Sequence, residues 1–146
     1  MIKTNQAAIV KYAEEVCKKD NLQFTKYRKK ALELILKSPS AMKAYDLLKK
    51  LDKKGLPPPV IYRALDFLME KRLIHKISSN SSYVACHHPE QIHSCYFLIC
   101  IKCHNISECC DSELDNAIEK LAEKNKFTPQ NPVLEISGLC QKCSKA

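Results

Sequence analysis

The chain has 146 residues, of which 45% are hydrophobic and 27% charged, so it can form one buried core or two small ones. No stretch has the apolar run of a signal peptide or a membrane span, so we expect a cytoplasmic protein without a membrane partner. Residues 1–83 carry 18 Lys and Arg against 8 Asp and Glu, net +10, whereas residues 84–146 carry 6 against 8, net −2. The first half therefore has the charge of a polyanion-binding domain, and the second half does not.

The first half is expected to be mainly helical. The spacing of apolar residues predicts four helices, over residues 4–19, 26–38, 41–53 and 60–71. Thr25 is suited to cap the second helix, Gly55 to end the third, and the prolines at 57–59 fit the start of the fourth. Cys17 lies on the apolar stripe of the first helix, where it is expected to be a small buried hydrophobe.

The fourth helix is expected to have two different faces. Its buried stripe comprises Val60, Ile61, Ala64, Leu65 and Leu68, and its other side carries Tyr62, Arg63, Asp66 and Glu70. Strands follow at residues 73–77 and 82–86, joined by a polar turn. Two helices with a short turn and then a β-hairpin form a winged helix-turn-helix, whose second helix enters the DNA major groove.

Several side chains of this half are candidates for DNA contact. Arg63 is the predicted base contact, because a guanidinium pairs bidentately with guanine. Lys26 and Arg28 begin a helix, where cations oppose the helix dipole, which favours a role in phosphate contact. Tyr45 and Tyr62 are expected to contact bases or phosphates, although burial of Tyr62 against the preceding helix is an open alternative.

The second half has the pattern of a small β-β-α-β domain over residues 93–146. A polar, proline-containing segment at 85–92 predicts a hinge after a DNA-binding domain at 1–84. Strands are expected at residues 96–99, 105–109 and 133–136, with a helix at 112–126 capped by Ser112. In that helix Leu114, Ile118 and Leu121 are expected to face inward. A domain of this size needs a metal and a dimer partner for stability.

Two Cys-x-x-Cys pairs frame this second domain. Cys100 and Cys103 form the first, and Cys140 and Cys143 form the second, with 36 residues between the two pairs. Each pair turns sharply enough to present two thiolates, and together they predict a tetrahedral structural zinc site. In a reducing compartment such pairs indicate metal binding or redox chemistry rather than disulfides.

These features together resemble the ferric uptake regulator superfamily, and within it the zinc uptake regulator branch. The matching segments are Thr25-x-x-Arg28, residues 44–48, residues 58–65, the series His75, Cys86 and His93, and both cysteine pairs. The resemblance implies an α+β homodimer with a winged-helix domain and a small α/β dimerisation domain. It departs from the usual pattern at Lys26, where the family has proline, and in the lack of a His-rich tail.

The resemblance implies a second, regulatory zinc, hence two zinc ions per chain. Its ligands would be His75, Cys86, His93 and Glu108, and the thiolate favours zinc over ferrous iron. The implied function is a zinc-responsive transcriptional repressor of zinc uptake genes that binds a palindromic double-stranded operator, without a small-molecule substrate. A regulator of the same superfamily that senses iron or peroxide is the open alternative.

Enzymatic alternatives fit less well. A zinc nucleobase deaminase would use His88-Pro89-Glu90, but it requires a proline before its Cys-x-x-Cys, which neither pair has. A thioredoxin-like redox role for Cys100 and Cys103 would require a βαβ unit around the pair, which the sequence does not predict. The roles of the remaining cysteines are left open. Cys95 and Cys110 could be packing residues or substitutes in metal exchange. The adjacent Cys109 and Cys110 could sense oxidation or be inert.

Overall fold

The computed structural model describes residues 5–145, which form two compact units. The boundary between them in the sequence lies between Gln91 and Ile92. The boundary lies within residues 85–92, the predicted hinge, and the hinge itself stays a prediction. The overall class is α+β, as expected from the sequence. Within the described residues, no helix is both long and apolar enough to cross a membrane.

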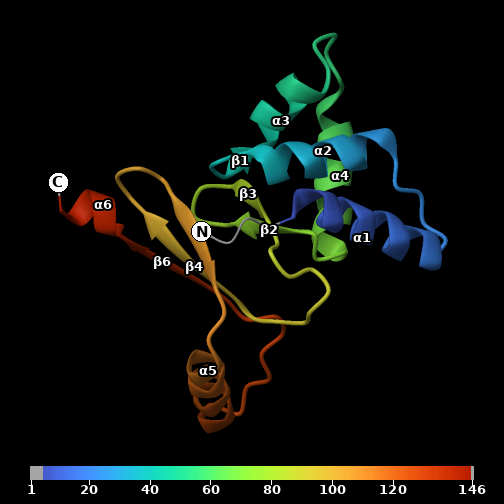
Figure 1. Ribbon diagram of the computed structural model, residues 1–146. Helices are drawn as coiled ribbons and strands as arrows, with labels where there is room; N and C mark the ends of the chain where they lie inside the picture. Colours follow the sequence, from blue (N-terminus) through green and yellow to red (C-terminus); the bar gives the residue numbers. More distant parts are fainter. Residues whose placement is uncertain (1–4, 146) are drawn as a thin grey trace. The chain divides into compact units, whose positions relative to one another are not determined.

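The N-terminal unit combines four helices with a three-stranded antiparallel sheet in the order β1-β3-β2 (Figure 1). Its elements are α1 (Gln6–Lys19), α2 (Lys26–Lys37), β1 (Met42–Lys43), α3 (Ala44–Leu51), α4 (Pro58–Glu70), β2 (Ile74–Ile77) and β3 (Ser82–Ala85). The four helices and the hairpin were predicted, and they have the order of a winged helix-turn-helix.

Local chemistry sets the ends of these helices. The side chains of Asn5 and Thr25 accept hydrogen bonds from the backbone N–H groups of Ala8 and Arg28, which satisfies donors that have no partner inside the helix. Pro58 occupies the first turn of α4, where its missing N–H costs no helical hydrogen bond. The cap at Thr25 was predicted from the sequence.

One apolar cluster holds this unit together. Leu32, Leu47, Leu65 and Leu68 are completely buried, and Cys17 lies in the same cluster at 2% exposure, as its place on the α1 stripe predicted. Together these five residues come from α1, α2, α3 and α4, so the helices pack around a common interior.

Two predictions about the third helix were wrong. The helix begins at Ala44, because Met42 and Lys43 instead pair with Tyr83 and Ser82 as strand β1. It ends at Leu51, so Gly55 is not its C′ residue but lies in the following turn with φ of +90°. A positive φ of this size is accessible to glycine at little cost.

The C-terminal unit is a three-stranded sheet in the order β5-β4-β6 with a crossover helix (Figure 1). Its elements are β4 (Cys95–Cys100), β5 (Ile106–Cys109), α5 (Ser112–Lys124), β6 (Val133–Gly138) and α6 (Gln141–Ser144). Strand β5 is antiparallel to β4, and β6 is parallel to it. The predicted cap of α5 is one residue too late, because Asp111 rather than Ser112 accepts from the N–H of Leu114, at 2.9 Å.

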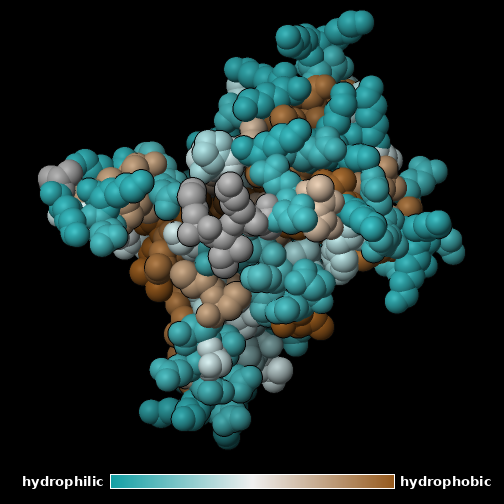
Figure 2. All heavy atoms as spheres, viewed as in Figure 1, coloured by the Kyte–Doolittle hydropathy of each residue, from teal (hydrophilic) through white to brown (hydrophobic). Residues whose placement is uncertain are grey.

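This second unit buries few residues. Tyr96 and Phe97 form its centre, and the Tyr96 hydroxyl donates to Asp115, which ties α5 to the sheet. Ala122 is the only buried residue of α5, and Leu121 is 63% exposed, so the prediction that Leu121 faces inward was wrong. Figure 2 shows hydrophobic side chains at the surface where Figure 1 places β6.

Candidate metal centres and nucleic-acid interface

The four paired cysteines lie together in the C-terminal unit. The sulfur atoms of Cys100, Cys103, Cys140 and Cys143 all lie within 4.8 Å of one another. Cys100 ends β4, and Cys103 closes the turn that follows. Cys140 is the N-cap of α6, and Cys143 lies within that short helix. The parallel pairing of Cys100 with Gly138 brings the two ends of the domain into register, which places the second pair beside the first.

The geometry and chemistry of this cluster fit zinc. A tetrahedral ion with Zn–S bonds of 2.3 Å places sulfurs about 3.8 Å apart, and the sulfurs of Cys103 and Cys140 are 3.7 Å apart. Backbone N–H groups of Cys103 and Cys140 lower the pKa of the Cys100 thiol to about 5, so it is already a thiolate at neutral pH. Zinc would be held by all four sulfurs, with no open position for chemistry.

A second group of metal-binding side chains lies in the same unit, near the other end of β4. Ligand atoms of His93, Cys95 and Glu108 lie within 4.8 Å of one another, and His93 Nε2 is 2.9 Å from Glu108 Oε1. The Glu108 side chain is 4% exposed and that of His93 is 14% exposed. A nitrogen, a sulfur and a carboxylate oxygen are all ligands that zinc accepts.

The other two residues of the predicted quartet belong to the N-terminal unit. His75 lies in β2 opposite Val84, and Cys86 follows β3 directly. The backbone N–H of Cys86 donates to the carbonyl of Leu73 at 2.9 Å, and its side chain is fully buried. His75 therefore lies in one strand of the hairpin and Cys86 directly after the other, while His93 and Glu108 are paired in the C-terminal unit.

The sequence left Cys95 open, as a packing residue or a substitute in metal exchange, and did not place it among the four regulatory ligands. The signal lies in the strand register, because Cys95 is two residues before Phe97 in β4 and Phe97 pairs with Glu108. His93 lies just before the strand. Side chains separated by two positions in a strand share a face. Cys109 pairs with Tyr96 on the opposite face, and desolvation followed by the charge of Glu108 raises the pKa of the Cys110 thiol.

The outer side of the winged helix presents the expected polar face. Ile61, Ala64, Leu65, Phe67 and Leu68 of α4 are buried. Tyr62 is 52% exposed and Arg63 is exposed beside it, so Tyr62 is not buried against the preceding helix. Tyr45 is 65% exposed in the first turn of α3, and the Lys49 ammonium lies 4.3 Å from the centre of its ring.

The basic residues at the start of α2 differ from each other. Lys26 is exposed. The guanidinium of Arg28 lies 3.7 Å above the Phe67 ring and donates to the carbonyl of Gln23, so it also links α2 to α4. DNA contact by either residue stays a prediction.

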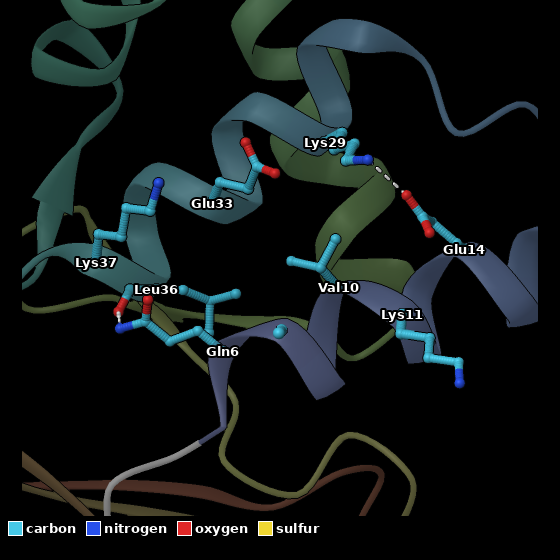
Figure 3. Close-up of a pocket in the computed structure, with 9 residues that line it drawn as sticks. Gln6, Val10, Lys11, Glu14, Lys29, Glu33, Leu36 and Lys37 are labelled. Atoms are coloured by element: carbon cyan, nitrogen blue, oxygen red, sulfur yellow. Dashed lines mark hydrogen bonds and ion pairs between the residues drawn. The ribbon is translucent and has the colours of Figure 1, made fainter.

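A shallow groove runs between α1 and α2, as Figure 3 shows. Val10 and Leu36 contribute its apolar floor, Lys29 is paired with Glu14 across it at 2.6 Å, and Gln6 donates to the carbonyl of Leu36. These contacts join the two helices.

Comparisons with known proteins agree with this arrangement. A family model described as the ferric uptake regulator family matches residues 19–137. The chain belongs to the ferric uptake regulator family. It is also 37% identical to the zinc uptake regulation protein of Escherichia coli (strain K12), over 98% of this chain and 85% of that protein.

Solved structures extend the similarity to the whole fold of a ferric uptake regulator. A zinc uptake regulator complexed with zinc and DNA has a TM-score of 0.89 at 35% identity, with 97% of each chain covered. The crystal structure of holo XcZur has a TM-score of 0.84 at 40% identity and covers 95% of this chain and 99% of that chain.

Family membership decides between the classes of function. The chain is a DNA-binding metalloregulator similar to zinc uptake regulators, and it is not an enzyme, so the deaminase and thioredoxin alternatives are wrong. It has two candidate metal sites, one made of four cysteines and one that includes histidine, cysteine and glutamate.

Proposed function

We propose that the chain is a zinc-responsive repressor of zinc uptake genes, which binds its operator as a homodimer when a regulatory zinc is bound. The observation that carries the proposal is the presence of two separate metal-binding clusters in a chain similar to a zinc uptake regulator. The four-cysteine cluster closes the coordination sphere and suits a permanent structural ion, whereas the mixed cluster suits an ion that exchanges.

The regulatory ion would be held by His75, Cys86, His93 and Glu108. The first two residues belong to the N-terminal unit and the last two to the C-terminal unit, so one ion bound by all four would fix the DNA-binding unit against the dimerisation unit. Zinc raises DNA affinity in this scheme only by binding the DNA-competent orientation more tightly than the others. A thiolate among the ligands selects zinc over ferrous iron and manganese.

DNA recognition is assigned to the exposed side of α3 and α4. Arg63 would contact a guanine edge, with Tyr62 and Tyr45 beside it against bases or phosphates. Lys26 and Arg28 would add contacts to phosphates that weaken as salt rises. The concentration of positive charge in residues 1–83 supports this assignment.

Dimerisation is assigned to the C-terminal unit. Val133, Leu134 and Ile136 of β6 are 57%, 37% and 45% exposed, although they are apolar and belong to a strand of the sheet. Exposed apolar clusters of this kind mark interaction sites. A two-fold dimer would present two winged helices to the half-sites of a palindromic operator.

The proposal is tested by DNA binding at buffered free zinc, with iron(II) and manganese(II) as comparators. Zinc should promote operator binding at far lower free concentration than either other metal. His75→Ala or Cys86→Ser should abolish the zinc response, because each removes a regulatory ligand, while the protein stays a folded dimer. His88→Ala, which removes an exposed histidine of the same segment, is the matched control and should keep the response.

Two results would contradict the proposal. Promotion by iron(II) at lower free concentration than zinc would favour the iron-sensing alternative, and loss of DNA binding on exposure to peroxide would favour the oxidation-sensing one. An unfolded Cys86→Ser or His75→Ala protein would mean that these residues are structural.

A further inference from the structure

The face of the C-terminal sheet that carries Glu108 also carries a cysteine outside the proposed quartet. In the pairing of β4 with β5, Glu108 lies opposite Phe97. Cys95 is two residues before Phe97 on β4, so its side chain leaves the sheet on the same face and is a diagonal neighbour of Glu108. The alternation therefore brings a thiol beside a carboxylate from strands that are not adjacent in sequence.

His93 completes this arrangement. It precedes Cys95 by two residues, and its Nε2 atom is 2.9 Å from Glu108 Oε1. The ligand atoms of His93, Cys95 and Glu108 all lie within 4.8 Å of one another, and Cys95 is 8% exposed. The Cys95 thiol is 3.9 Å from the carbonyl oxygen of His93, a weak contact that a stronger bond to metal can replace.

Other cysteines near Glu108 do not have this placement. Cys109 pairs with Tyr96, so its side chain lies on the opposite face of the sheet. Cys110 is exposed and belongs to neither metal-binding group found among residues 5–145. Cys100, at the far end of β4, is about 17 Å away at the rise of a strand and belongs to the four-cysteine cluster. Cys95 alone therefore offers a sulfur to this second group from within the C-terminal unit.

We propose that Cys95 is a zinc ligand of the regulatory site, and that His93, Cys95 and Glu108 form a three-ligand cradle built entirely within the C-terminal unit. The proposal rests on the proposed function, because it concerns the same site. Zinc binding replaces the S–H bond of Cys95 with an S–Zn bond and releases the proton to solvent, with no change in oxidation state. One tetrahedral position remains for a ligand of the N-terminal unit.

This cradle would determine the order in which the site is assembled. Zinc would bind first to the C-terminal unit. In a second step His75 and Cys86 would bind it, one in the open position and the other in place of Cys95, which leaves the four ligands of the proposed function. The affinity of the cradle would then set the zinc concentration at which the regulator responds, and the second step would set how strongly DNA binding changes.

The test uses the full-length dimer with zinc retained at the four-cysteine site and cobalt(II) added as the probe of the second site. Each thiolate bound to cobalt(II) contributes a charge-transfer absorption band, so the band reports which cysteines are ligands. The Cys86→Ser variant should keep a thiolate band from the second cobalt, and Cys86→Ser combined with Cys95→Ser should lose it. Cys95→Ser alone should weaken zinc binding at this site by at least about tenfold, since loss even of an outer-shell partner costs that much.

Cys110→Ser is the matched control and should keep both the band and the affinity. A second variant, Cys95→Ala, separates loss of the ligand from a folding defect, because alanine at this buried position leaves no polar group without a partner. Circular dichroism checks that both variants are folded. The proposal is overturned if Cys95→Ser and Cys95→Ala bind zinc and cobalt as the unmodified protein does, or if Cys86→Ser alone removes the band. If Cys95 binds cobalt but the affinity for DNA is the same with and without metal at the second site, the ligand assignment is correct and the proposed function is wrong.

Discussion

The two units of this chain are stabilised in different ways. The N-terminal unit buries a continuous apolar cluster that includes Leu32, Leu47 and Leu65 at zero exposure. The C-terminal unit buries little beyond Tyr96, Phe97 and Ile99 of one strand, and its helix buries only Ala122. Instead of a large core, the second unit has a cluster of four cysteines and an apolar surface. We therefore expect the second unit to depend on metal and on a partner for its stability, and the first to depend on its own packing.

The difference also separates the functions. The unit with the self-sufficient core carries the exposed Arg63 and Tyr62, which are assigned to DNA. The unit that depends on ligands carries both the four-cysteine cluster and the cradle of His93, Cys95 and Glu108. In the proposed function the metal signal enters at the second cluster of the C-terminal unit, while the four-cysteine cluster serves the stability of that unit.

The largest effect is expected from breaking the four-cysteine site. Cys140→Ser should prevent retention of the structural zinc and unfold the C-terminal unit, because the small core cannot replace the metal. The N-terminal unit should keep its helical structure. Hydrogen exchange by mass spectrometry, with zinc content measured in parallel, distinguishes the two units.

Cys110→Ser is the control for that experiment, since it removes an exposed cysteine outside the cluster. A Cys140→Ser protein in which both units keep their protection against exchange would show that the metal is not required for the fold.

A core substitution should have the reverse pattern. Leu65→Ala removes a fully buried side chain of α4 and should lower the free energy of unfolding of the N-terminal unit by about 2–5 kcal/mol. Zinc content should stay unchanged, because the four cysteines lie in the other unit. Urea unfolding followed by circular dichroism measures the loss, and Leu22→Ala, at a residue 39% exposed, should cost far less.

The smallest of the three effects concerns DNA recognition. Arg63→Ala should cost about 1–3 kcal/mol of discrimination between the operator and a variant with the contacted guanine replaced. Stability and zinc content should not change, because the side chain is exposed. Fluorescence anisotropy with both DNA duplexes measures the difference.

Lys37→Ala, which removes another exposed positive charge of the same unit, should at most weaken binding to both duplexes equally. An Arg63→Ala protein that still prefers its operator as strongly as before would refute the base contact.

Local patterns were enough to predict much of this fold. The cap at Thr25, the buried face of α4 and the burial of Cys17 each follow from spacing within one helix. The cysteine pairs could also be read from sequence, because each turn constrains two sulfurs on its own. Most of what was missed, although not the cap of α5, depends on partners far away in the sequence.

Strand β1 shows that dependence clearly. It has only two residues, and it exists because Met42 and Lys43 pair with the distant Tyr83 and Ser82. The role proposed for Cys95 has the same origin, since it follows from the register of β4 against β5. No local spacing relates Cys95 to Glu108, so a list of cysteines leaves the residue without a function. The exposure of Leu121 was missed because the helical stripe was assigned to the interior of a single chain.

The central claim is that one metal site maintains the fold while the other controls DNA binding. Zinc content and operator affinity, measured on the same protein over a series of buffered free zinc concentrations, test it most directly. The account predicts that about one zinc per chain is retained throughout, and that operator affinity rises only as a second zinc binds. Operator affinity that follows the loss of the first zinc, or that is constant while the second binds, would contradict it.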